Sequence, residues 1–97
     1  MSTEFLITGL LRTWVLIRAK DNGVVFGKDI IDTMGQIDHT VSPGTIYPLL
    51  ATMVKKGLLR RTPSTWDPRQ VHYVITDRGE IALAQARGFL AGALSDW

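Results

Sequence analysis

Residues 42–76 read SPGTIYPLLATMVKKGLLRRTPSTWDPRQVHYVIT, and this stretch predicts a helix followed by two strands. Ser42-Pro43 is a strong helix start, because a serine side chain can accept a free backbone N–H and a proline lacks the N–H that would otherwise be unpaired there. We expect the helix to run to Lys56 and to stop at Gly57. A helix followed by a two-stranded wing is the recognition half of a winged helix-turn-helix.

The two faces of this helix differ in the size and polarity of their side chains. At about 100° per residue, the large apolar residues share one face, namely Ile46, Leu49, Leu50 and Met53. The opposite face is small or polar and ends in a cation: Gly44, Pro48, Ala51, Thr52 and Lys55. Because small residues allow a helix to approach a groove floor closely, we expect this face to enter DNA. Pro48 removes one backbone hydrogen bond and should bend the helix slightly.

Two strands are expected at 58–62 and 71–76, and the second alternates in the manner of a half-buried strand. The eight residues 63–70 between them carry turn chemistry, with Pro63, Pro68 and polar residues. That connection is too long for a tight hairpin and has the length of a wing.

Positive charge is concentrated in the predicted helix and wing. The segment 42–76 nets +4, although the whole chain nets +2, because it holds five of the eleven basic residues: Lys55, Lys56, Arg60, Arg61 and Arg69. DNA phosphate is the obvious partner of such a module. Arg60 and Arg61 alternate on a strand, so only one of them can face DNA, and Arg69 is the candidate for the minor groove. Lys55 and Lys56 can also be solvated charges favoured by the helix dipole, and the two roles can coexist.

Three further helices are expected, at 4–19, 27–34 and 77–94. The first is apolar nearly all round, which predicts burial against the core on one side and against a second subunit on another. The second is expected to close at Gly35. No internal repeat is present.

The last helix has two alternative starts and one apolar seam. Asp77 to Glu80 has the form of a capping box, and Thr76 is the alternative cap. The seam steps by three and four residues, as in a coiled coil: Leu83, Ala86, Leu90, Ala93 and Trp97.

Composition indicates one small globular domain. The chain has 97 residues, of which 45% are apolar and 21% are charged, and it has no cysteine. The absence of cysteine excludes disulfides and thiolate metal sites and suits a reducing cytosol. The start MSTEF carries an acid where a signal peptide carries positive charge, and no apolar run approaches the ~18 residues of a membrane span. We therefore expect a cytoplasmic, nucleoid-associated protein without a membrane partner.

The sequence contains no pattern that indicates an enzyme or a metal site. His39 and His72 are single and lack a neighbouring cluster of ligands, so no metal is expected. Asp29 and Asp32 are interpreted as the solvated face of a short helix rather than as a catalytic pair. A phosphate-binding glycine loop and a nucleophile motif are both absent. We expect no catalytic activity and no cofactor.

Five stretches resemble the PadR family of transcriptional regulators. They are LLRTWVLIRA at 10–19, Phe26–Ile30, Ser42–Leu50, Lys56–Leu58 and Tyr73–Gly79. The pair GTIYPLL and YVITDRG, at this spacing, is the most specific part of a resemblance that covers roughly residues 5–85. It implies a DNA-binding repressor that dimerises through its first and last helices. The chain departs from many relatives in two ways, since its wing offers only Arg69, beside Asp67, and its C-terminal helix is single and short.

The residue pattern and the resemblance together give two sets of expected contact residues. The DNA-binding set is Ser42, Gly44, Thr45, Tyr47, Pro48, Thr52, Lys55, Arg61 and Arg69. The dimer set is Leu6, Leu10, Trp14, Leu83, Leu90 and Trp97. Tyr47 either bonds a phosphate through its hydroxyl or caps the core. Trp14 and Trp97 either pack in the dimer or line a pocket for a flat hydrophobic effector, as in some relatives.

The expected fold is α+β, mainly α: a winged helix-turn-helix of order H-H-H-E-E-H with a C-terminal dimerisation helix. Residues 1–97 are expected to form a single winged-helix DNA-binding domain, in which 77–97 form the dimerisation helix. The expected function is sequence-specific binding of double-stranded DNA by a homodimeric transcriptional repressor. Two alternatives stay open: a plasmid or viral segregation or architectural protein that binds DNA, and a winged helix used for protein–protein contact.

Overall fold

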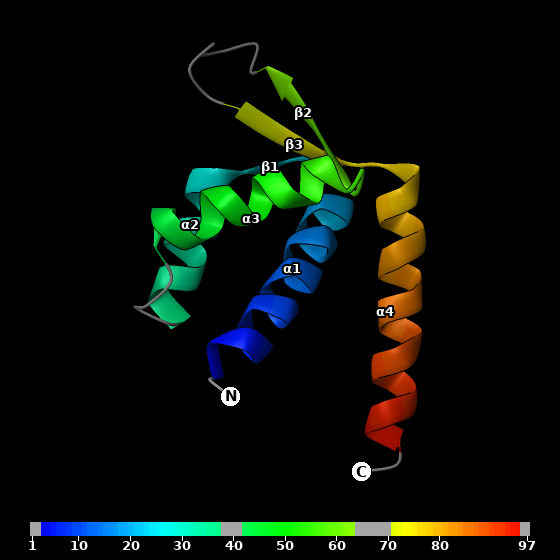
Figure 1. The fold of residues 1–97 in the computed structure, drawn as a ribbon. Helices are drawn as coiled ribbons and strands as arrows, with labels where there is room; N and C mark the ends of the chain where they lie inside the picture. The colour runs from blue at the N-terminus through cyan, green and yellow to red at the C-terminus, as the bar shows by residue number, and fades with distance from the viewer. Residues whose placement is uncertain (1–2, 38–41, 64–70, 96–97) are drawn as a thin grey trace.

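The computed structural model describes residues 3–37, 42–63 and 71–95 and arranges them as helices around a small sheet (Figure 1). The elements in chain order are α1 (Thr3–Asn22), β1 (Val25–Phe26), α2 (Gly27–Ile37), α3 (Pro43–Lys55), β2 (Leu59–Pro63), β3 (Val71–Ile75) and α4 (Asp77–Ser95). The strand order is β1-β3-β2, and both pairings are antiparallel. The predicted winged-helix order is confirmed, with β1 as an addition.

Strand β1 is the element that the sequence did not predict. It has only two residues, and it exists through its pairing with β3, in which Val25 lies opposite Tyr73 and Phe26 lies opposite His72. Two residues carry no readable alternation, and their partner strand is more than 40 positions further along the chain. The third strand therefore depends on tertiary contact rather than on a local pattern.

Two helix ends differ from their prediction. Helix α1 continues through Asn22, and the turn is left to Gly23, whose φ of +81° suits a glycine. Helix α2 passes through Gly35 and continues to Ile37. Gly35 was expected to close this helix, but among the described residues only Gly23 and Gly57 have the positive φ of a helix-closing glycine.

Helix α3 begins and ends where it was predicted, but Ser42 does not cap it in the expected manner. Ser42 has extended backbone angles and makes no side-chain capping hydrogen bond. Its carbonyl oxygen instead accepts hydrogen bonds from the N–H groups of Thr45 and Ile46, at 2.9 and 3.0 Å. The exposed Ser42 hydroxyl is therefore not engaged in a helix cap.

The C-terminus of α3 is a Schellman motif. The N–H of Leu58 donates to the carbonyl of Met53 at 2.9 Å, and the N–H of Gly57 donates to the carbonyl of Val54 at 2.9 Å. Gly57 has a φ of +78°, which a residue with a Cβ adopts only at a cost. This turn passes the chain directly from α3 into β2.

The core lies between α1, α3 and the sheet, with α2 and α4 packed at its sides (Figure 1). All the residues of the predicted inner face of α3 are buried. The complete set of buried apolar residues is Leu11, Val15, Leu16, Ala19, Val25, Ile30, Ile46, Leu49, Leu50, Met53, Leu59, Tyr73 and Leu83. No helix in the described part of the chain is long and apolar enough to span a bilayer.

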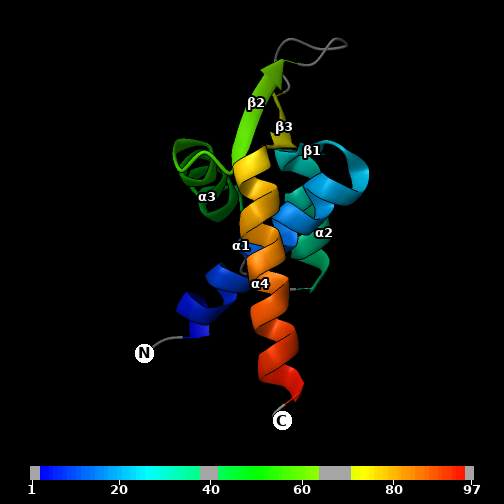
Figure 2. The ribbon, with the colours of Figure 1, turned by 90° about the vertical axis from the view of Figure 1, so that its right-hand side faces the viewer.

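The seam of α4 divides between the core and the outside. Leu83 was expected at the dimer interface, but it is only 1% exposed and belongs to the core of its own subunit. Leu90, two turns further along, is 37% exposed, and Phe89 beside it is 74% exposed. Both ribbon views show the C-terminal half of α4 extending beyond the other helices (Figures 1 and 2). The seam therefore leaves the core where α4 runs past the body of the domain.

Thr76 joins the end of α3, the start of β2 and the start of α4. Its hydroxyl accepts the N–H of Gly79 at 3.0 Å, which makes Thr76 rather than Asp77 the cap of α4. The same hydroxyl donates to the carbonyl of Gly57 at 2.5 Å, and the Thr76 N–H donates to the carbonyl of Leu58 at 3.2 Å. The side chain of Arg78 reaches the carbonyl of Lys56 at 3.4 Å. The recognition half of the fold is thus tied to α4 by hydrogen bonds.

Thr76→Val is expected to lower the free energy of unfolding by about 1–3 kcal/mol, because it leaves one backbone donor and one acceptor without their partner at unchanged side-chain volume. Urea denaturation followed by circular dichroism measures this. Thr13→Val is the matched control, since the Thr13 hydroxyl makes only a backbone bond within α1, to Gly9 at 3.2 Å. Equal effects of the two substitutions would contradict the role of Thr76.

Candidate nucleic-acid interface

The outer face of α3 is open, as the sequence predicted. Six of the residues expected to contact DNA are exposed on it or at its ends: Ser42, Gly44, Thr45, Tyr47, Pro48 and Lys55. Thr52, the seventh of these residues, is half-buried, and its hydroxyl donates a hydrogen bond to the Pro48 carbonyl at 2.9 Å. Thr52 therefore offers an outside group its lone pairs and its methyl group rather than a free donor.

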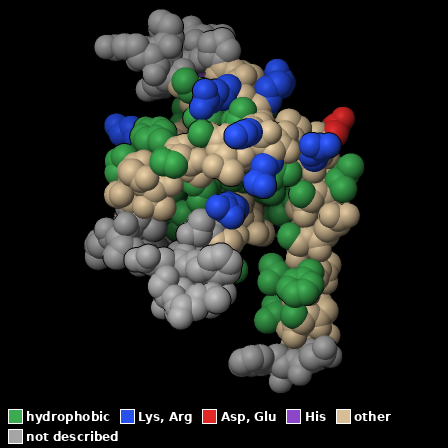
Figure 3. All heavy atoms as spheres, in the orientation of Figure 1, with side chains coloured by type: hydrophobic (Ala, Val, Ile, Leu, Met, Phe, Trp, Pro, Cys, Tyr) green, Lys and Arg blue, Asp and Glu red, His purple; other side chains and the backbone are tan. Residues whose placement is uncertain are grey.

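Lysine and arginine side chains gather around α3 and the base of the wing (Figure 3). Lys55, Lys56, Arg60 and Arg61 are all exposed. On the face shown in Figure 3, acidic side chains appear only at the edge, near the start of α4. Arg69, the cation expected near the tip of the wing, lies outside the described residues.

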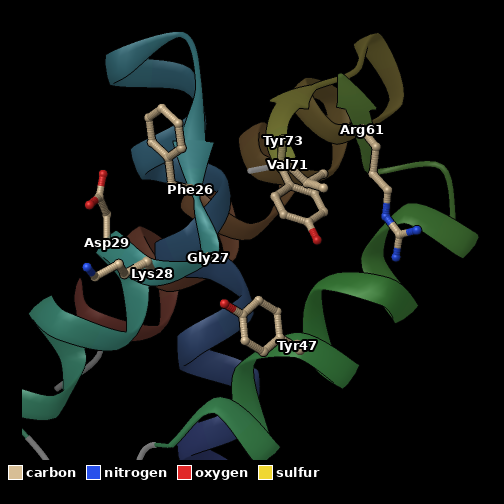
Figure 4. Close-up of a pocket in the computed structure, with 8 residues that line it drawn as sticks. All are labelled: Phe26, Gly27, Lys28, Asp29, Tyr47, Arg61, Val71 and Tyr73. Carbon is tan, nitrogen blue, oxygen red and sulfur yellow. The ribbon is translucent and has the colours of Figure 1, made fainter. Parts of the chain in front are cut away.

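A cleft of about 570 Å³ separates α3 from the sheet and from the start of α2 (Figure 4). We call it the α3–wing cleft, and its lining residues are Phe26, Gly27, Lys28, Asp29, Tyr47, Arg61, Val71 and Tyr73. The side chain of Arg61 enters this cleft from β2. Because successive side chains of a strand point to opposite faces, the neighbouring Arg60 lies on the other face of β2. Of this adjacent pair, Arg61 is the one that faces α3.

Two tyrosines place hydroxyl groups at this cleft. Tyr47 is 49% exposed, and Figure 4 shows its hydroxyl directed toward the start of α2, so Tyr47 does not simply cap the core. Its ring lies so close to α2 that a Cβ on Gly27 would come within 2.8 Å of the Tyr47 Cε1 atom. Tyr73 is only 5% exposed, yet its hydroxyl points into the cleft.

The sequence prediction missed part of this cleft. Phe26, Gly27 and Lys28 were noticed only as part of one matching stretch, and Tyr73 only as part of another and of an alternating strand. None of these four residues was predicted to contact DNA. The local signal for Gly27 was its position at the start of a predicted helix, but nothing local indicated that Tyr47 would pack against it.

The described residues of the expected dimer set differ widely in their exposure within one subunit. Leu10 is 60% exposed on α1, whereas Trp14 is half-buried and packs against the core. The guanidinium carbon of Arg18 lies 5.4 Å from the centroid of the Trp14 ring. A cavity beside them measures about 30 Å³, which is room for about one water molecule rather than an aromatic effector. Trp97 and the side chain of Leu6 lie outside the described part of the chain.

No group of three or more His, Cys, Asp or Glu side chains converges within the described residues. Asp29 and Asp32 are exposed on α2, as expected of a solvated face. His72 packs edge-on against Phe26, with 4.2 Å between ring centroids, and its buried Nε2 has no hydrogen-bond partner among the described residues. His39 lies outside them.

An open helix face, flanking cations and a three-stranded sheet that ends in a wing define the winged-helix class of DNA-binding domains. Residues 15–85 match the model of the transcriptional regulator PadR-like family, and the chain belongs to that family. It is therefore a DNA-binding transcriptional regulator and not an enzyme. No curated protein sequence matches it significantly.

Solved structures share the fold across nearly the whole chain. A putative transcriptional regulator from Thermoplasma acidophilum is 26% identical, with a TM-score of 0.71, and the match covers 94% of this chain and 92% of that one. A PadR-like transcription factor from Bacteroides fragilis is 23% identical, with a TM-score of 0.75, and the match covers 96% and 91%. MarR from E. coli is 20% identical, with a TM-score of 0.75, and the match covers 87% of this chain but 58% of MarR. The last two show the fold alone.

Proposed function

We propose that this regulator is a homodimeric repressor that binds a specific site in double-stranded DNA through α3 and its wing. The observation that carries the proposal is the outer face of α3, which is exposed, built of small or polar residues and flanked by Lys55, Lys56 and Arg61. A helix that only met water would need no such combination of close-approach residues and cations. Bound across a promoter, the dimer would exclude polymerase.

In this proposal α3 enters the major groove, and Thr45 and Thr52 reach base edges while Ser42, Gly44 and Pro48 allow close approach. Lys55 at the end of α3, Arg61 on β2 and Arg69 in the wing would neutralise backbone phosphates, with Arg69 over the minor groove. Phosphate contacts would set the register of the helix, and the threonines would supply preference among sequences.

Exposed apolar residues on α1 and α4 support the proposed dimer. Phe89 and Leu94 lie on the projecting half of α4, and Leu10 lies on α1. A green patch marks the far end of α4 in Figure 3. Burying such side chains against a second copy of the chain would stabilise the dimer by about 1.5–3 kcal/mol for each fully buried residue. A two-fold dimer would read a roughly palindromic site with half-sites about one helical turn apart.

DNA binding is expected to weaken steeply with salt. Three or four cations per subunit would give about 6–8 phosphate contacts per dimer, hence a slope of log affinity against log salt of about −5 to −7. Fluorescence anisotropy on a duplex selected from random oligonucleotides measures this slope. A flat response would indicate a winged helix used for protein contact instead.

Lys55→Ala should reduce the steepness of that slope by about 2 per dimer, since one phosphate contact is lost in each subunit. Lys20→Ala is the matched control, because Lys20 is on α1 and already pairs with Glu80 at 3.4 Å. Footprinting of the protein on its DNA site distinguishes the two DNA-binding roles. A single short protected site upstream of a gene indicates regulation, whereas an array of protected repeats indicates segregation.

A further inference from the structure

We propose that Arg78 is a positioning residue of the DNA-binding dimer: it holds α3 at a fixed angle to α4 and so sets the distance between the two recognition helices. Arg78 does not touch DNA in this proposal. The inference rests on the proposed function, a homodimer that binds DNA through α3 and associates through α4. It deepens that function by naming a residue that determines the separation of the two half-sites.

The side chain of Arg78 belongs to the first turn of α4 but binds the end of α3. Its Nη1 donates to the carbonyl of Lys56, the C-cap of α3, at 3.4 Å. The same side chain lies over the closing turn, since a Cβ on Gly57 would come within 3.4 Å of the Arg78 Cδ and Nη1 atoms. A cation is unfavourable at the N-terminus of its own helix and favourable at the C-terminus of another. The position of Arg78 is therefore explained by α3 rather than by α4.

Arg78 adds a third point of attachment between two segments that already meet closely. The Thr76 hydroxyl bonds both the Gly57 carbonyl and the Gly79 N–H, and Gly79 packs directly on the Leu58 carbonyl. Two points fix a distance but allow rotation about the line that joins them, whereas three points fix an orientation. We call this contact the α3–α4 joint, formed by Lys56, Gly57, Leu58, Thr76, Arg78 and Gly79.

The joint controls the angle because α3 and α4 have little contact along their lengths. Helix α3 packs on α2 and β2, whereas α4 packs on α1 and β3. Figure 1 shows the two helices leaving the same corner of the domain in different directions. Helix α3 has 13 residues and is therefore about 20 Å long. Tilting it by about 10° about its C-terminal end moves its N-terminal residues by about 3.5 Å, the rise of one base pair in duplex DNA.

The first test uses a duplex that the wild-type protein selects from random oligonucleotides, with base pairs added or removed between its two half-sites. One base pair should lower wild-type affinity by roughly tenfold, because the second α3 then misses its contacts. Arg78→Met removes the donor and keeps an apolar arm over Gly57. In this variant the same change should cost only about two- to threefold, because α3 can tilt to follow its half-site. Affinity for an isolated half-site and the salt slope should stay at their wild-type values.

Two further variants separate positioning from charge. Arg78→Lys keeps a donor within reach of the Lys56 carbonyl and should restore most of the spacing preference. Arg60→Ala removes an exposed cation that lies outside the joint and should leave the preference unchanged. If Arg78→Met keeps the wild-type preference, or weakens all spacings alike with a shallower salt slope, the positioning role is overturned while DNA binding stands. If the wild-type protein selects no duplex, the proposed function fails first.

A second measurement needs no DNA. Because the chain has no cysteine, Ala51→Cys on the exposed face of α3 places one spin label in each subunit. Pulsed electron paramagnetic resonance between the two labels of a dimer should give a narrow distance distribution with Arg78 and a broader one with Arg78→Met. Circular dichroism should show both proteins folded, since Arg78 is exposed. Equal widths of the two distributions would overturn the proposal, and the absence of any distance between labels would instead contradict the dimer.

Discussion

Gly79→Ala is expected to cost at least about 3 kcal/mol of folding free energy, a large part of the roughly 5–15 kcal/mol of a small domain. A Cβ at this position would lie 2.2 Å from the carbonyl oxygen of Leu58 and 2.8 Å from Cγ1 of Ile75. Atoms of the backbone cannot swing aside as a flexible side chain can, so α4 and the start of β2 would have to separate. The Leu58 carbonyl also accepts the Thr76 N–H, so the separation would break the junction between α3 and α4.

Urea denaturation gives the measurement, and Gly88→Ala on the same helix is the control. A Cβ on Gly88 meets nothing within 4 Å, so alanine should stabilise α4 by up to about 1 kcal/mol there. Replacing glycine by alanine is therefore expected to lower the free energy of unfolding at position 79 and to raise it at position 88. A Gly79→Ala protein with the midpoint of the wild-type protein would show that α4 packs differently.

Leu83→Ala is expected to lower the free energy of unfolding by about 2–5 kcal/mol, because it removes a side chain that is 1% exposed and leaves a cavity between α4 and the rest of the core. Leu90→Ala is the comparison, since Leu90 lies on the same seam but is 37% exposed within one subunit. Its effect should appear as weaker self-association in sedimentation equilibrium, with a smaller effect on the folding of each subunit.

The comparison requires two protein concentrations, because the stability of a dimer rises with concentration whereas an intrasubunit cavity acts at all of them. The Leu83 effect on the free energy of unfolding should persist at both concentrations. The Leu90 effect should be smaller at the lower concentration, where the wild-type dimer is itself largely dissociated. If Leu90→Ala proved as damaging as Leu83→Ala at the lower concentration, the division of the seam between core and interface would be wrong.

The elements that sequence reasoning predicted correctly are those that depend on neighbours a few positions apart. Ser42-Pro43 placed the start of α3, the apolar residues at helical spacing gave its buried face, and Gly57 placed its end. Each of these signals acts within one or two turns of helix, so the residues involved are visible together in the sequence. The class of the fold followed from the order of such elements.

The remaining features required contacts between distant parts of the chain. Strand β1 exists because β3 pairs with it. Leu83 and Leu90 occupy equivalent positions in the apolar seam of the sequence. They differ in exposure because the rest of the domain covers α4 at Leu83 but does not extend as far as Leu90.

The sequence by itself therefore determined the winged-helix class, the two faces of α3 and the concentration of cations around it. The tertiary structure decided which cation faces α3 and which side chains gather in the α3–wing cleft, where Gly27, Tyr47, Arg61 and Tyr73 come from separate elements. The physical reason is one of range: hydrogen-bonding and hydrophobic periodicity act locally, whereas a binding site forms where packing of the whole chain brings remote residues together.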